Sequence, residues 1–285
     1  MTSIIHDMPN AEYHAAAAIG SSGLKLIARS PLHYWAKCLN PERELDEQTP
    51  SQKLGTAYHT AIFEPERFEA EYVALPDGLD RRTKEGKKLY QDIEDSGAIP
   101  IGGKDYATVC MMADAGRNHG AMQVIFNIAG GFAEASLFFT DPETGADCKI
   151  RPDYMIPPGV TTLFPHGLII DGKSCGDARE EEFFRDVWGY EYHTQAAFYV
   201  DGFQSVYKTT HPPKFLWLVQ EKEVPAVMVH GVPEKLLRRG RKSYRKSLEV
   251  YAACKLAGKW PGYSSTVKDL ALPGWVEKLI DEGEV

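Results

Sequence analysis

Two charged residues, Asp171 and Lys173, lie two positions apart inside an otherwise apolar run at 168–174. The run predicts a buried strand, on which residues two apart point to the same face. Burying an acid beside a lysine is costly unless the two pair with each other or bind a metal. A second acid, Asp153, follows Pro152 in the preceding segment. Two carboxylates and an ammonium brought to one point suit a divalent cation and an activated water.

Further polar residues accompany these acids in a fixed order along the chain. His59 lies on a predicted helix and Glu134 on a predicted strand. Gln195 and Tyr199 are four residues apart and therefore share one face of a helix. Each residue alone has an ordinary interpretation, as a structural or surface histidine, an outward-facing glutamate or a helix-face pair. Their common order, histidine, glutamate, Pro-Asp, Asp-x-Lys and Gln-x-x-x-Tyr, is a stronger signal.

The elements that must position these residues alternate between helices and strands. A capping residue, Ser21 or Ser22, opens the first helix. That first helix lies at 23–29, and further helices are predicted at 53–63, 83–96, 105–128, 180–207 and 233–256. Predicted strands lie at 133–139, 147–151, 168–174, 214–220 and 226–232, the first two as a hairpin. This order predicts an α/β fold with a central mixed sheet flanked by helices.

Bulk composition sets the class of protein. The 285 residues are 43% hydrophobic and 25% charged, as in an ordinary soluble globular protein. No apolar run is long enough to span a membrane, and the first residues do not form a secretory signal. Five scattered cysteines without a Cys-x-x-Cys pair indicate reduced thiols in a cytoplasmic protein and argue against a zinc or iron–sulfur site.

The charge distribution does not exclude an anionic binding partner. The net charge is −8, yet recognition depends on local patches rather than on the average. Two basic clusters, at 81–88 and 235–246, stand out. Each is either a solvated surface or a contact for an anion such as the DNA backbone.

The ordered motifs resemble those of the PDDEXK nuclease superfamily, and Gln-x-x-x-Tyr with an upstream histidine is similar to its RecB-like branch. Segments in the N-terminal half are similar to RecE-type exodeoxyribonuclease VIII nuclease domains: 13–15, 19–25, 30–34 and 55–68. The resemblance covers about residues 7 to 255. The chain departs from the pattern in a longer loop before Asp171, and in having Asp there instead of the commoner Glu.

The resemblance implies a fold and an activity. It implies a PDDEXK restriction-endonuclease-like core in one exonuclease domain, 1–285, with a helical part at about 1–130, a nuclease core at about 131–255 and a tail at about 256–285. It implies a Mg²⁺-dependent enzyme that digests one strand of double-stranded DNA from the 5′ end and leaves a 3′ overhang. It also implies a ring-shaped homotetramer and a RecT-type single-strand annealing partner in recombination of phage origin.

Site roles follow from the resemblance together with the chemistry. Phosphodiester hydrolysis needs a metal that neutralises phosphate charge and lowers the pKa of a water. Mg²⁺ prefers oxygen ligands, whereas a histidine ligand also suits Mn²⁺. The expected metal-site residues are His59, Glu134, Asp153, Asp171 and the carbonyl of Gly172. The expected catalytic residues are Asp153, Asp171, Lys173, Gln195 and Tyr199, with Lys173 orienting the water and the last two positioning the phosphate or Lys173.

A 5′-directed exonuclease also needs a pocket for a terminal phosphate. Ser21, Ser22, Lys25 and Arg29 surround a short helix whose N-terminus offers free amide groups and a favourable dipole. Arg151 is a further candidate because it precedes Pro152-Asp153. The alternative is a capped helix that carries surface charges.

Two other functions remain open on the sequence. A PDDEXK endonuclease of restriction or CRISPR-associated type would share the metal site, but 285 residues leave little room for a target-recognition module. A non-catalytic DNA-binding protein could keep a degenerate nuclease fold. Against it, Asp153, Asp171 and Lys173 are all present.

Overall fold

The computed structural model describes residues 2–43, 48–76, 78–80 and 82–282. The strands are β1 (Ser3–Ile5), β2 (Tyr72–Leu75), β3 (Ile99–Gly102), β4 (Phe132–Ala133), β5 (Ser136–Thr140), β6 (Asp147–Ile150), β7 (Tyr154–Ile156), β8 (Leu168–Cys175), β9 (Lys214–Glu221) and β10 (Val227–Gly231). The helices are α1 (Asn10–Ala15), α2 (Ser21–Arg29), α3 (Pro31–Tyr34), the π-helix η1 (Trp35–Leu39), α4 (Pro50–Phe63), α5 (Pro65–Glu71), α6 (Lys84–Asp95), α7 (Gly103–Asn118), α8 (Gly120–Phe126), α9 (Glu180–Gly189), α10 (Tyr192–Tyr207), α11 (Glu234–Ala257) and α12 (Gly274–Asp281).

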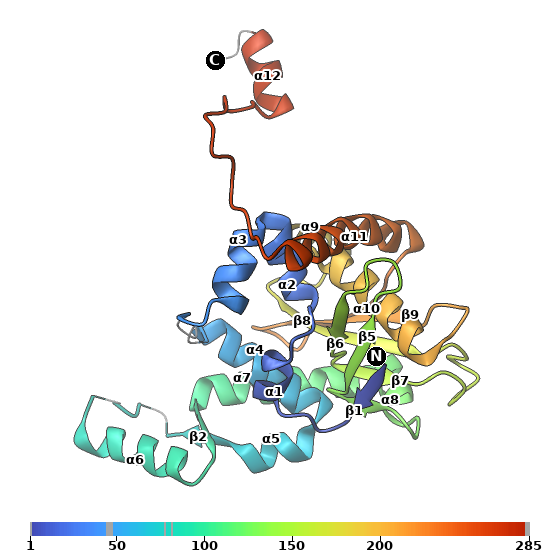
Figure 1. The fold of residues 1–285 in the computed structure, drawn as a ribbon. Helices are drawn as coiled ribbons and strands as arrows, with labels where there is room; N and C mark the ends of the chain where they lie inside the picture. The colour runs from blue at the N-terminus through green and yellow to red at the C-terminus, as the bar shows by residue number, and fades with distance from the viewer. Residues whose placement is uncertain (1, 44–47, 77, 81, 283–285) are drawn as a thin grey trace.

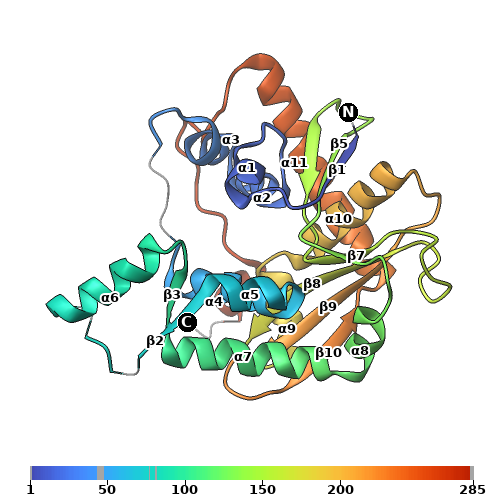
Figure 2. The same ribbon diagram turned by 90° about the horizontal axis from the view of Figure 1, so that it is seen from below.

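The central sheet has the strand order β10-β9-β8-β7-β4. Strands β8 and β9 are parallel, and the other neighbours are antiparallel, so the sheet is mixed. Helices α10 and α11 lie on one side of it and α4, α7 and α8 on the other (Figure 1, Figure 2). The α/β class with a mixed sheet flanked by helices is therefore confirmed.

The predicted hairpin exists, but it is bent and belongs to two sheets. Its outer half, β5 and β6, pairs with β1 in a separate three-stranded sheet, and its inner half, β4 and β7, pairs in the central sheet. The bend falls at Glu134 on one arm and at 151–153 on the other. Pro152 has no amide hydrogen for a ladder, which explains why pairing is interrupted there. The predicted hairpin thus joins the central sheet only next to the bend, through β4.

Strand β8 separates two hydrophobic cores because its side chains alternate between the faces of the sheet. Ile169 packs with α10 and the β5–β6 hairpin. Leu168 and Ile170 pack with α4, α7 and α8. The strand predicted at 168–174 is thus confirmed, and it is fully buried along its apolar half. Toward the end of β8 the alternation continues, so successive residues point to opposite faces of the sheet.

Two predicted long helices are each broken in two. The segment 105–128 forms α7 and α8, separated at His119, which has extended backbone geometry. The segment 180–207 forms α9 and α10, separated at Tyr190 and Glu191, and Glu191 has a left-handed φ of 56°. A residue in that conformation cannot continue a right-handed helix. The helix α2 begins at Ser21 with Gly20 as its N-cap, so the predicted cap at Ser21 or Ser22 is wrong.

The C-terminal segment leaves the body of the molecule after α11. Trp260 still packs against Tyr34 and Tyr251. Beyond residue 263 the chain extends away and ends in α12, which has no buried residue (Figure 1). In the described part of the chain, no helix has both the length and the apolar composition that a membrane crossing requires.

Candidate active site

The bend of the hairpin brings two acids together. Glu134 and Asp153 lie on opposite arms, and the backbone N–H of Glu134 donates to the backbone carbonyl of Asp153 at 3.2 Å. Glu134 has a φ of 49°, a conformation uncommon for residues other than glycine. Such conformations often occur where function requires a particular side-chain direction. The bend therefore places the two carboxylates close together.

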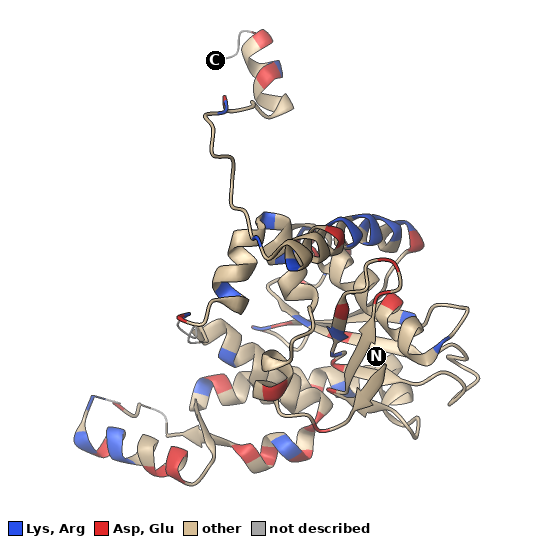
Figure 3. Cartoon of the chain, viewed as in Figure 1, with Lys and Arg blue, Asp and Glu red and all other residues tan. Residues whose placement is uncertain are grey.

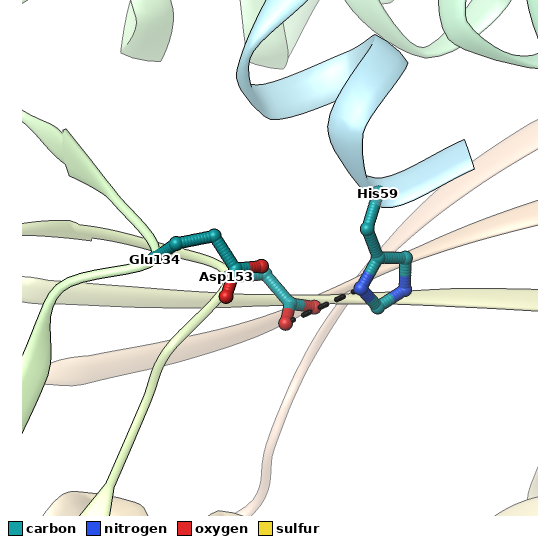
Figure 4. A group of neighbouring side chains, drawn as sticks. All are labelled: His59, Glu134 and Asp153. Atoms are coloured by element: carbon teal, nitrogen blue, oxygen red, sulfur yellow. Dashed lines mark ion pairs between the residues drawn. The ribbon is translucent and has the colours of Figure 1, made fainter. Parts of the chain in front are cut away.

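His59 completes a three-residue cluster with these acids. It comes from α4, and its Nδ1 lies 3.4 Å from Oδ1 of Asp153. One ligand atom from each of His59, Glu134 and Asp153 lies within 4.8 Å of the others (Figure 4). Three residues predicted from separate parts of the sequence thus converge. We refer to them as the metal-site triad.

Gly172 allows α4 to approach the sheet closely. Its backbone N–H donates to Oδ2 of Asp153 at 2.6 Å. A β-carbon at this position would lie 3.1 Å from Cε2 of Phe63 and 3.4 Å from Nε2 of His59. A side chain here would therefore push Phe63 or His59 aside by a few tenths of an ångström, and glycine leaves the imidazole in place beside β8. The structure shows a role for the Gly172 amide; its carbonyl as a metal ligand remains a prediction.

Asp171 and Lys173 point to the opposite face of β8, toward α10. Asp171 is only 1% exposed, and its Oδ2 lies 2.5 Å from Nζ of Lys173. Nε2 of Gln195 donates to the other oxygen, Oδ1, at 3.3 Å. The buried Tyr199 is hydrogen-bonded with Gln195. Asp171, Lys173, Gln195 and Tyr199 thus form one connected chain of polar contacts, as their spacing predicts.

The carboxylates and the imidazole shift each other's pKa values. Burial opposes protonation of His59, but the Asp153 charge and hydrogen bond outweigh it and raise the pKa of the imidazole to about 9. Burial, with the charge of Asp153, raises the pKa of Glu134 to about 8. Burial would raise the pKa of Asp153, yet His59 holds it below the ordinary value. Burial raises the pKa of Asp171 despite the neighbouring Lys173. A nearby positive charge would favour every ionised carboxylate here.

The donor set fits a divalent metal ion. An imidazole nitrogen and two carboxylates are ligands that Mn²⁺ and Mg²⁺ sites use. Burial and the charge of Asp153 together raise the pKa of Glu134, and a cation at this place would stabilise the ionised carboxylate against both. Asp171 and Gly172 border the metal-site triad on β8, but the Asp171 carboxylate contacts Lys173 and Gln195 instead.

The expected phosphate-pocket residues do not all gather at the site. Lys25 does reach the site, because its Nζ lies 5.9 Å from the centre of the Tyr192 ring that also faces Lys173, and burial with the charge of Lys173 lowers its pKa. Arg151 donates two hydrogen bonds to Oγ of Ser136, and its charge acts on Glu134. Arg29 instead donates to the hydroxyl of Tyr263, on the C-terminal segment.

The two serines occupy the first turn of α2. Ser21 is half-buried and Ser22 is exposed, and neither side chain caps the helix. Their hydroxyls, like the first amides of α2, are therefore not used in a capping interaction. Their role as phosphate contacts remains a prediction.

Sequence reasoning missed two residues beside the site. The ring of Tyr192 lies 4.7 Å from Nζ of Lys173. Tyr192 precedes Gln195 by three positions, so helical periodicity places both on one face and could have found it. The negative charge of Glu64, just after α4, acts on both Glu134 and Arg151. No local motif marks Glu64.

Comparison with known proteins decides the family. Residues 20–271 match the model of a family described as a PDDEXK-like domain of unknown function (DUF3799). The chain belongs to this family. The match spans most of the chain, including all residues of the site described above. Membership confirms the PDDEXK resemblance at the level of the superfamily and gives the protein a nuclease-like fold.

One solved structure has a similar fold over almost the whole chain. A crystal structure named "Putative exonuclease" from Eubacterium rectale aligns with a TM-score of 0.58 and 13% identity, over 96% of both chains. The structure of SSO0001 aligns with a TM-score of 0.30 and 11% identity, over 69% of this chain and 87% of that chain. At these identities the first likeness shows the fold alone, and the second supports nothing further. No curated protein matches the sequence.

Proposed function

We propose that this PDDEXK-family protein is a metal-dependent 5′→3′ exodeoxyribonuclease. It would digest one strand of linear double-stranded DNA and leave 3′ overhangs for recombination by single-strand annealing. The observation that carries the proposal is the buried Asp171–Lys173 pair, held by Gln195 directly beside the metal-site triad. The exonuclease named among the solved structures has the same fold, which supports a nuclease of this kind.

The residues of the chain divide the chemistry between them. His59, Glu134 and Asp153 would hold Mg²⁺, or Mn²⁺, with Asp171 joining from β8. When bound, the ion would neutralise phosphate charge and lower the pKa of a water. Lys173, fixed between Asp171 and the ring of Tyr192, would orient that water and stabilise charge that develops on the phosphate.

Gln195 and Tyr199 would act through Asp171. Gln195 donates to one carboxylate oxygen, so the other is left for Lys173. Tyr199 holds Gln195 in place, and burial keeps the phenol neutral because it raises the pKa well above its ordinary value. These two residues therefore position the Asp171–Lys173 pair and need not touch the substrate.

The proposal is tested with end-labelled linear duplex DNA and a covalently closed circle of the same sequence in Mg²⁺. The expected result is loss of nucleotides from the 5′ end of the linear duplex, an intact circle, and no digestion by Asp171→Ala. Cleavage of the circle would instead indicate an endonuclease. DNA binding without metal-dependent cleavage would indicate a non-catalytic protein.

Recognition of a 5′ phosphate is the second part of the proposal. Lys25, close to Lys173, and Arg151, beside Glu134, are the supporting residues, with Ser21 and Ser22 on the first turn of α2. The expected result is faster digestion of a 5′-phosphorylated duplex than of a 5′-hydroxyl duplex, and loss of this difference in Lys25→Gln. Equal rates on both ends in the unmodified protein would contradict it.

Assembly and partnership complete the proposal. We propose a homotetrameric ring through which DNA passes, and a RecT-type single-strand annealing protein that receives the 3′ overhang. Sedimentation equilibrium of the full chain would give four times the 31.8 kDa of one subunit. Addition of an annealing protein of this type during digestion would give joint molecules from two duplexes with shared end sequences.

A further inference from the structure

Helix α11 carries its basic residues on two faces with different surroundings. The inward-facing Arg241 pairs with Asp201, and Arg245 pairs with Asp141. The outward-facing basic residues are exposed, and none forms an ion pair within the described part of the chain. These residues form the basic stripe: Lys235, Arg238, Arg239, Lys242 and Lys246. Figure 3 shows how densely Lys and Arg follow this helix in a chain whose net charge is −8.

Exposed aromatic rings lie at the end of α9 and in the turn that follows it. Trp188 is 52% exposed and Tyr190 is 60% exposed. Each rests on a second ring: Trp188 stacks on His193 with centroids 5.2 Å apart, and Tyr190 stacks on Tyr192 at 5.5 Å. We name Trp188, Tyr190 and Tyr192 the aromatic shelf. The Trp188 and Tyr190 rings each have one face covered by the partner ring, yet more than half of each residue stays exposed.

The aromatic shelf joins the basic stripe at one end and the candidate active site at the other. The Arg239 guanidinium lies 5.8 Å from the centre of the Trp188 ring. At the other end, Nζ of Lys173 lies 4.7 Å from the centre of the Tyr192 ring. Nζ of Lys25 donates to the backbone carbonyl of Tyr190 at 2.6 Å and so places a further cation between the two ends. Cations therefore lie at both ends of the aromatic shelf, at Arg239 and Lys173, with Lys25 bound to Tyr190 between them.

We propose that the basic stripe and the aromatic shelf form a binding track for single-stranded DNA that leads to the candidate active site. This inference rests on the proposed nuclease function and extends it. Cations along the track match phosphates, and exposed rings match unpaired bases, which is how proteins hold single strands without sequence preference. In a duplex the base faces are covered by stacking, so duplex DNA can use the stripe but not the shelf. The acidic first turn of α9, at 180–182, lies at the far end of that helix from Trp188.

The shelf is tested by equilibrium binding without catalysis. A fluorescently labelled oligothymidine is titrated with full-length protein in EDTA, and anisotropy reports the affinity. Trp188→Ala is expected to weaken binding about tenfold, because one base–ring stack is lost. Trp275→Ala removes an exposed indole from α12, away from the shelf, and is expected to bind like the unmodified protein.

The stripe is tested by the salt dependence of the same affinity. Replacing three cations of α11 together, Lys235→Gln, Arg238→Gln and Lys242→Gln, is expected to lower the slope of log affinity against log salt by about 2, since each lost phosphate contact on a single strand removes roughly 0.7. The matched control neutralises three exposed lysines of α6, Lys84, Lys87 and Lys88, and is expected to keep the slope. All replaced residues are exposed, so the fold is retained, which far-UV circular dichroism checks.

The outcomes separate this inference from the proposed function. Binding by Trp188→Ala equal to that of the unmodified protein would overturn the track, while digestion of linear DNA in Mg²⁺ would leave the nuclease proposal standing. If the α6 changes lowered the slope of log affinity against log salt as much as the α11 changes did, the role of the basic stripe in binding DNA would be overturned. An unmodified protein that binds duplex DNA at least as tightly as the oligothymidine, with no effect of Trp188→Ala, would also overturn the track. Tight, shelf-dependent binding without any digestion would uphold the track and reject the nuclease.

Discussion

At the scale of single residues, we expect Lys173 and the metal-site triad to have separable tasks. Lys173 contacts Asp171 and Tyr192 but is not one of the three converging ligands. Lys173→Met is expected to lower the rate of hydrolysis by at least about 100-fold, since positioned proton-transfer groups contribute that much or more. Its affinity for Mn²⁺, measured by calorimetry, is expected to stay within a few-fold of the original.

The matched change on the other side of the site is Asp153→Asn, which removes a ligand of the triad. This variant is expected to lose Mn²⁺ affinity as well as activity. If Lys173→Met lost metal affinity as strongly as Asp153→Asn, the division of tasks between the two faces of β8 would be wrong.

The protonation of the triad gives a dependence of metal affinity on pH. The pKa of His59 is raised to about 9 and that of Glu134 to about 8, so both groups hold protons at pH 7 in the metal-free protein. A metal binds only their deprotonated forms, and binding must therefore release protons. Affinity for Mn²⁺ is expected to rise as the pH increases from 6 to 9. Calorimetry at pH 7 in two buffers of different ionisation enthalpy measures the protons released, and a value near zero would contradict the prediction.

At the scale of elements, α10 and α11 approach so closely that one glycine is required. A β-carbon at Gly240 on α11 would lie 2.1 Å from the backbone oxygen of His193 on α10. Backbone atoms cannot move aside as a flexible side chain can, so the helices must separate. Gly240→Ala is expected to lower the free energy of unfolding by about 1–3 kcal/mol or more, as overpacked cores do. Urea denaturation measures this change.

The control for Gly240 is Gly55, in the helix that carries His59. A β-carbon at Gly55 would meet nothing within 4 Å. Gly55→Ala is expected to leave stability unchanged or to raise it by up to about 1 kcal/mol, because alanine has the higher helix propensity. Equal destabilisation by both changes would show that the α10–α11 contact is not the cause.

At the scale of the whole molecule, the part of the C-terminal segment beyond residue 263 is not packed on the folded body. The segment packs through Trp260 and Tyr263, whereas Val267 and Leu270 are at least 90% exposed and α12 buries nothing. A chain that ends at residue 263 is therefore expected to unfold at the same temperature as the full chain. Differential scanning calorimetry checks this, and a lower midpoint would mean that the segment folds back onto the body or onto another subunit.

Local sequence by itself predicted which polar side chains of one element lie together, because that placement depends on short-range spacing. Asp171 and Lys173 are two residues apart on one strand and therefore lie side by side on the same face. Gln195 and Tyr199 are four residues apart and therefore share one face of a helix. The mixed sheet flanked by helices followed from the order of the periodic segments. These features need only the geometry of single elements, which the sequence specifies directly.

The tertiary structure alone decided how the parts meet. The bend at Glu134 and Pro152 assigns one hairpin to two sheets, and the close approach of α4 over Gly172 brings His59 to Asp153. The break at Glu191 frees Trp188 and Tyr190 to form a surface between α11 and Lys173. Contacts between residues so distant in the chain depend on how whole faces pack, and periodicity within one element carries no information about its neighbour.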